Sequence, residues 1–183
     1  MGKHLLNSFG LLAGTGLLLA SCSGKDDNVK GNLVTRNDFE AVLGWGGNAD
    51  VSVTSEKAHS GKYSVKVGPQ NEYGYTYVNT LGNMSTAKTK AITVSAWVWM
   101  PNNQQAATLA LSVTRSPEQG ASLFYGGINL SKAVTKYNSW QKVSQTFTMP
   151  DTVRSTNQLK CYLWRTAAND NVYADDITIS VND

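Results

Sequence analysis

The chain has 183 residues, and its 16 Lys and Arg residues and 13 Asp and Glu residues give a formal net charge of +3. The basic residues are scattered rather than gathered into a stripe, which argues against a nucleic-acid partner. Gly, Ser, Thr and Asn are plentiful and helix-period stretches are missing from the body, so short strands and turns are predicted.

Residues 1–21 have the three-part layout of a secretion signal, with Lys3 and His4, an apolar run "FGLLAGTGLLLA" and small residues at the end. The apolar run of about 12 residues is too short to span a bilayer. The ending "LASC" resembles the lipobox of bacterial lipoproteins, which implies that the leader is removed before Cys22 and that Cys22 carries lipid. A plain signal peptide with a stray cysteine is the alternative.

Residues 22–32 are expected to form a lipidated cysteine followed by a flexible tether, because "SGKDDNVKGN" is polar and free of aromatic residues. Several acyl chains on one residue give firm membrane anchoring. The segment "SGKDD" resembles the export signal that sends lipoproteins of some glycan-foraging Gram-negative bacteria to the outer surface. This resemblance implies a lipid-anchored protein of the outer membrane, exposed at the cell surface.

Residues 33–183 are predicted to form one domain of strands with alternating apolar and polar residues, separated by turn-rich pieces such as "GWGGNAD" and "MPNNQQ". In "AITVSAWVWM", the residues from Ile92 to Met100 at even positions share the face expected to form the core. "LALSVTR" and "LKCYLWRT" repeat the scheme, which turns Cys161 inward as a small hydrophobe. The fold class predicted is an all-β, antiparallel two-sheet β-sandwich of the jelly-roll type.

The same alternation predicts an outward aromatic surface. Val78 is taken as the inward residue of "NEYGYTYVNT", which turns the neighbouring tyrosines outward. If the strands are neighbours, their rings cover one exposed face, and six residues are then predicted to contact a ligand: Trp97, Trp99, Tyr162, Trp164, Tyr75 and Tyr77. Tyr73 and Tyr125 are expected either at the rim of this surface or in packing. Trp45 and Trp140 are interpreted as structural.

Five segments, in order, resemble the carbohydrate-binding modules of families four, nine and twenty-two, over about Asn32 to Ser180. They are "NDFE" followed by "GW", "SEKAHSGKYSVKV", "AITVSAWVWM", "SWQKVSQTFTMP" and "VYADDITI". The resemblance implies a galactose-binding-like jelly roll whose concave face holds glycans on aromatic side chains, often with a structural calcium ion at one edge. Aromatic rings suit this ligand because a sugar has one apolar face of C–H groups and an equator of hydroxyls.

A calcium ion (Ca²⁺) is expected where the first and last strands meet, since the related folds place these strands side by side. Glu40, Asp175 and Asp176 are the predicted ligands, with backbone carbonyls of the "EKAHSGK" turn. Asp175 is preferred over Asp176. The alternative is a group of solvated acids at a strand end.

No enzyme is predicted. His4 leaves with the leader and His59 lies in a turn, so no nucleophile and base are paired by the sequence. Glu72 and Glu118 are the remaining candidates for a carboxylate pair, and neither lies in a recognisable catalytic motif. The predicted function is a non-catalytic glycan-binding surface lipoprotein that holds polysaccharide near glycan-degrading or importing proteins. The alternative is a structural or adhesive jelly-roll module that binds protein partners at the cell surface.

Overall fold

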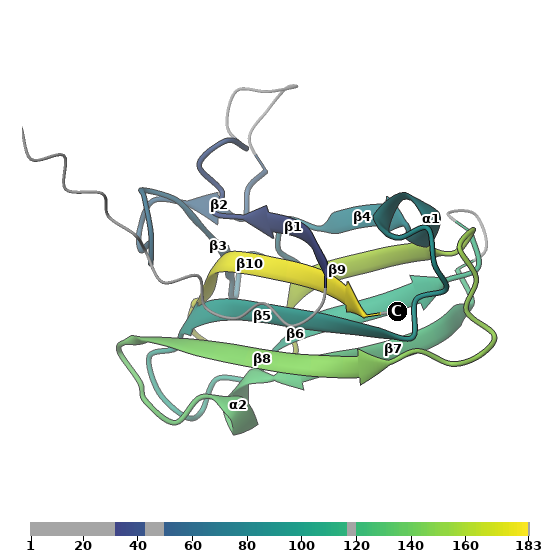
Figure 1. The fold of residues 1–183 in the computed structure, drawn as a ribbon. Helices are drawn as coiled ribbons and strands as arrows, with labels where there is room; N and C mark the ends of the chain where they lie inside the picture. Colours follow the sequence, from purple (N-terminus) through teal and green to yellow (C-terminus); the bar gives the residue numbers. More distant parts are fainter. Residues whose placement is uncertain (1–31, 43–49, 117–119, 183) are drawn as a thin grey trace, which may run out of the picture.

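Two antiparallel sheets face each other in the computed structural model, which describes residues 32–42, 50–116 and 120–182 (Figure 1). The predicted leader at residues 1–21, Cys22 and the tether up to residue 31 lie outside the described residues, as do Trp45 and Glu118. The β-sandwich fold class predicted from the alternation is confirmed.

The six-stranded sheet has the order β2-β3-β10-β5-β8, and β1 pairs with β10 beside it. Its strands are β1 (Asn32–Asn37), β2 (Val53–Thr54), β3 (Ser64–Val67), β5 (Ala91–Trp99), β8 (Trp140–Thr148) and β10 (Val172–Asn182). The four-stranded sheet has the order β4-β9-β6-β7. Its strands are β4 (Tyr77–Thr80), β6 (Ala107–Thr114), β7 (Ser122–Asn129) and β9 (Gln158–Arg165), and two short helices, α1 (Leu81–Met84) and α2 (Leu130–Ala133), follow β4 and β7.

The core lies between the two sheets and is built from the alternating residues that the sequence indicates. On β5, Val94 and Val98 are at most 1% exposed, and on β9 Leu163 is fully buried. Each such side chain stabilises the fold by about 1.5–3 kcal/mol relative to an exposed position. The opposite faces of both sheets point away from the core, so each sheet offers its own outer surface.

The two sheets close against each other at one side of the sandwich and leave a space at the other. Phe124 of β7 and Phe147 of β8 meet edge to face at a centroid distance of 6.1 Å. Across the molecule, β1 and β4 border a cavity of about 330 Å³ lined by Tyr75 and Tyr77, among other residues. The cavity therefore lies at the edge of the sandwich, where β1 and β4 meet.

The expectation that all six rings share one face is wrong. Strand β5, which carries Trp97 and Trp99, belongs to the six-stranded sheet, whereas β9, which carries Tyr162 and Trp164, belongs to the four-stranded sheet. Alternation along a strand shows which side faces the core. It does not show which strands are neighbours, because that depends on long-range pairing.

The outward orientation of Tyr77 is also not observed, and Tyr75, although 39% exposed, borders the cavity beside β1. Val78 lies opposite Lys160 on the outer face and is 48% exposed, whereas Tyr77 lies opposite Cys161 and packs against the core. One exposed aliphatic residue on a short edge strand was a poor marker of the inner face, since exposed aliphatic side chains are common.

Candidate functional site

The outer face of the four-stranded sheet has a floor of small side chains. Across the sheet, Tyr162 of β9 lies opposite Ala110 of β6, and Ala110 lies opposite Gly127 of β7. In the next row, Trp164 lies opposite Thr108. The large rings of β9 therefore lie beside small side chains of β6, and Ala110 is fully buried among its neighbours.

A segment outside the regular strands extends this face. The N–H of Gly74 donates to the carbonyl of Leu163 at 2.8 Å, and the N–H of Arg165 donates to the carbonyl of Glu72 at 2.8 Å. Residues 72–74 thus continue the edge of the sheet alongside β9. Position 74 requires glycine, because a Cβ there would lie 2.8 Å from the Cγ2 atom of Val65.

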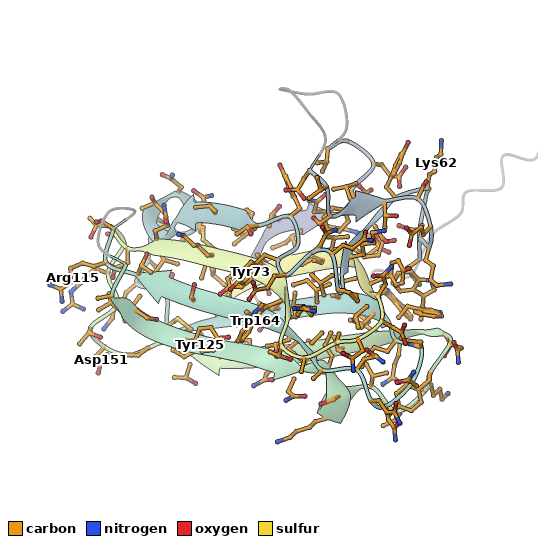
Figure 2. All side chains as sticks on the ribbon, turned by 180° about the vertical axis from the view of Figure 1, so that it is seen from behind. Lys62, Tyr73, Arg115, Tyr125, Asp151 and Trp164 are labelled. Carbon is orange, nitrogen blue, oxygen red and sulfur yellow. The ribbon has the colours of Figure 1, made fainter. Side chains whose placement is uncertain are left out.

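Four aromatic side chains gather on the outer face of the four-stranded sheet. Together with Glu72, they are given the name aromatic cleft, which stands for Glu72, Tyr73, Tyr125, Tyr162 and Trp164. Tyr73 lies parallel to Trp164 with ring centroids 6.4 Å apart, and meets Tyr162 edge to face at 5.8 Å. Tyr73 and Tyr125 are 52% and 53% exposed, respectively. Figure 2 shows Tyr73, Trp164 and Tyr125 together over the middle of the sheet.

Glu72 fixes two of these rings. The indole Nε1–H of Trp164 donates to its Oε1 atom at 3.4 Å. A hydrogen bond from the hydroxyl of Tyr73 to Glu72 raises the pKa of Tyr73. Burial raises the pKa of Tyr162, and the nearby hydroxyls of Tyr125 and Tyr73 raise it further. The phenols of Tyr73 and Tyr162 are therefore neutral at physiological pH and can both donate and accept hydrogen bonds.

The cleft contains residues to which the sequence assigned only a rim or packing role. On β7, Tyr125 alternates with Gly127 and Asn129, whereas Phe124 and Ile128 lie on the buried side. The alternation in "FYGGIN" is the signal that could have identified Tyr125 as outward. Tyr73 had no such signal, since it lies outside the regular strands.

Trp97 and Trp99 do not belong to this cleft. On the outer face of the six-stranded sheet, the ring of His59 stacks on Trp97 at a centroid distance of 3.9 Å and an interplanar angle of 12°. The ammonium group of Lys57 lies 4.1 Å from the ring centroid of Trp99. The loop between β2 and β3 therefore occupies ring faces that a sugar would need. Trp140 adds an edge contact to His59 at 5.8 Å.

The three acids predicted to bind calcium all contact the same turn. Asp175 is fully buried, and its Oδ2 atom accepts the N–H groups of His59 at 2.8 Å and Ser60 at 3.1 Å. Glu40 accepts the N–H groups of Lys62 and Tyr63 through Oε1, each at 2.6 Å. These acids thus cross-link the first and last strands to the turn.

Asp176 is paired differently. It adopts a left-handed backbone conformation, with φ of 48°, and its Oδ1 atom accepts a hydrogen bond from Arg36 at 2.9 Å. Its Oδ2 atom lies 2.7 Å from Nδ1 of His59. Burial opposes ionisation of Asp176, but the bonds from His59, Arg36 and Ser60 outweigh burial and lower its pKa.

The donor set fits a calcium site only in part. Glu40 keeps its Oε2 atom without a protein donor among the described residues, and Asp175 lies at the same turn, so both can offer oxygen. Asp176 is committed to Arg36 and His59. Within residues 32–42, 50–116 and 120–182, no three His, Cys, Asp or Glu side chains are grouped as a metal site.

Comparisons with known proteins agree with the β-sandwich fold and identify the family. A family described as "Carbohydrate binding domain" (CBM4/9) matches residues 31–169. Endo-1,4-beta-xylanase A of Thermotoga maritima is 30% identical over 151 residues, which are 80% of this chain but only 14% of that protein. The chain therefore spans about a seventh of that relative's length.

Two solved structures share the fold. The CBM22-1 xylan-binding domain of Xyn10C from Paenibacillus barcinonensis has a TM-score of 0.51 at 20% identity, covering 82% of this chain and 95% of that one. The C-terminal family 22 carbohydrate binding module of Xyn10B from Clostridium thermocellum has a TM-score of 0.54 at 15% identity, covering 82% and 93%, respectively.

The match over most of the chain shows that this protein belongs to the CBM4/9 family of carbohydrate-binding domains. The described part of the chain contains no helix of the length and apolarity needed to cross a membrane.

Proposed function

We propose that the chain is a non-catalytic module that binds polysaccharide in the aromatic cleft, with sugar rings stacked on Trp164 and Tyr162. The observation that carries this proposal is the group of aromatic rings on the outer face of the four-stranded sheet, where Tyr73 and Tyr125 are about half exposed. Stacking removes the apolar face of a sugar ring from water, and the phenol hydroxyls offer hydrogen bonds to its equator.

Xylan is the first polysaccharide to test, because structural neighbours of this chain are xylan-binding domains. Covering one face of a sugar ring contributes roughly 1 kcal/mol per aromatic platform. With association costs subtracted, affinities between about micromolar and millimolar are expected. Tyr73 and Tyr125 are about half exposed, so they do not close over a ligand. This favours binding along a polysaccharide chain rather than enclosure of a small ligand.

Replacing Trp164 by Ala tests the cleft. The loss of one platform should weaken binding to xylan at least roughly fivefold, measured by affinity electrophoresis or calorimetry. Trp97→Ala is the matched control, since it removes the same side chain from the other sheet. It should lower the melting temperature, because the contact with His59 is lost, but leave affinity unchanged. If Trp164→Ala and the wild type bind xylan with equal affinity, the aromatic cleft is not the sugar-binding site. The alternative of a protein-binding face would then be favoured.

Lipid anchoring at Cys22 and display at the outer surface complete the proposal. Its support is the sequence "LASC" followed by "SGKDD". Anchored in this way, the module would hold polysaccharide near glycan-degrading or importing proteins.

A further inference from the structure

The aromatic cleft carries opposite charges at its two ends. Glu72 lies beside Trp164, at the end where residues 72–74 run along β9. Lys160 lies at the other end, since positions 160, 162 and 164 of β9 share the outer face. Same-face residues along a strand are about 6.6–6.8 Å apart, so the ammonium group stands within the length of a bound oligosaccharide.

The neighbours of Lys160 do not neutralise it. Across the sheet, Lys160 lies between Val78 of β4 and Ser112 of β6, and Ser112 lies opposite Tyr125. None of these three side chains is acidic. In the described part of the chain, Lys160 has no hydrogen bond or ion pair, whereas Lys66 pairs with Glu56 and Lys88 pairs with Asp151.

A second cation stands at the same end. Arg115 follows β6, and Thr114, the last residue of β6, lies opposite Gln158, which precedes Lys160 on β9 by two positions. Figure 2 shows Arg115 at this end of the sheet, beyond Tyr125 and away from Trp164. Its guanidinium group likewise has no hydrogen bond or ion pair among residues 32–42, 50–116 and 120–182, and Arg115 is exposed.

We propose that the cleft selects polysaccharides that carry uronic acid groups, with a uronate carboxylate bound to Lys160 while neutral sugar rings stack on Tyr162 and Trp164. This inference rests on the proposed function. An ammonium group on a partly water-excluded face gains most from an anionic partner, through a charge-assisted hydrogen bond. Glu72 repels carboxylates at the opposite end, so the charge asymmetry also orients the bound chain.

The test compares glucuronoxylan with the same polymer after chemical reduction of its carboxyl groups, which removes the charge and keeps the backbone. The wild-type protein should bind the native polymer about fivefold more tightly than the reduced one. The preference should decline as salt is added, because exposed charges are screened. Lys160→Gln should lose most of this preference, with only the weaker contribution of Arg115 remaining, and should bind the reduced polymer as the wild type does.

Lys62→Gln is the matched control, since Lys62 is exposed and lies far from Tyr125 and Trp164 in Figure 2. It should retain the full preference. Equal wild-type affinity for the two polymers overturns the inference and leaves the proposed function intact. Loss of the preference in Lys62→Gln as well as in Lys160→Gln also overturns it, because net charge would then explain the effect. Failure of the wild type to bind either polymer overturns both proposals.

Discussion

Individual residues of the cleft are held before any ligand arrives. Tyr73 lies outside a regular strand, yet a backbone bridge to Trp164 and the hydrogen bond to Glu72 fix its position. Glu72 also accepts the indole N–H of Trp164. Rings that are fixed in this way lose little side-chain entropy on binding, and this loss is a large part of the cost of association.

Asp176 shows how single residues control stability with pH. Replacing it by Asn keeps a residue type that tolerates the left-handed conformation, but removes the charge that Arg36 and His59 contact. The variant should lose about 1–2 kcal/mol of unfolding free energy at pH 7. Asp151→Asn is the control, since its ion pair with Lys88 is fully exposed to solvent and its loss should leave stability almost unchanged.

The effect of Asp176→Asn should also depend on pH in a defined direction. The pKa of Asp176 is lower in the folded than in the unfolded chain, so the charge stabilises the fold above about pH 4. This stabilisation is lost as the pH falls through the folded-state pKa. The difference in melting temperature between wild type and variant should therefore narrow in acid. A difference that stays constant from pH 7 to pH 3 would contradict the assignment.

At the scale of elements, the strands follow from the sequence but their partners do not. Alternation along β5, β6 and β9 correctly predicts the buried Val94, Leu111 and Leu163, because a strand has a two-residue period. It could not show that β5 and β9 lie in different sheets, since sheet order depends on contacts far apart in the sequence. The cleft was accordingly predicted in part, with Tyr162 and Trp164 in place and Trp97 and Trp99 on the wrong surface.

The turn between β2 and β3 is the element on which the calcium proposal depends. Gly61 in this turn has a φ of 56°, and a Cβ there would lie 2.5 Å from the carboxyl group of Glu40. We propose a calcium ion held by Glu40, Asp175 and backbone carbonyls of this turn. Calcium at about 100 times its Kd should stabilise the domain by about 2.7 kcal/mol, or raise Tm by roughly 5–10 °C relative to a chelator.

Glu40→Gln should abolish this calcium-dependent rise in Tm, because a neutral amide is a weaker ligand for the ion. Glu56→Gln serves as the control, because the Glu56 carboxylate is bound to Lys66 and Tyr173. This variant should show the same calcium-dependent rise in Tm as the wild type. Identical melting curves of the wild type with calcium and with chelator would refute the proposal.

At the scale of the whole molecule, the cleft and the proposed anchor are separate parts of one chain. Replacing Cys22 by Ser should remove the site of lipidation and move the protein from the membrane fraction to the soluble fraction. Glycan affinity should be unchanged, because the cleft is built from residues 72–164. Membrane retention of the Ser variant would show that Cys22 is not the anchor. Protease treatment of intact cells then tests surface display, which predicts loss of the wild-type protein.

The most direct test of sugar binding on the four-stranded sheet is nuclear magnetic resonance of the tryptophan indole N–H groups during titration with xylohexaose. The Nε1–H signal of Trp164 should shift saturably, since this group contacts Glu72 within the cleft. The signals of Trp97 and Trp99 should stay in place, because both rings lie on the other sheet. Shifts at Trp97 and Trp99 with none at Trp164 would contradict the account.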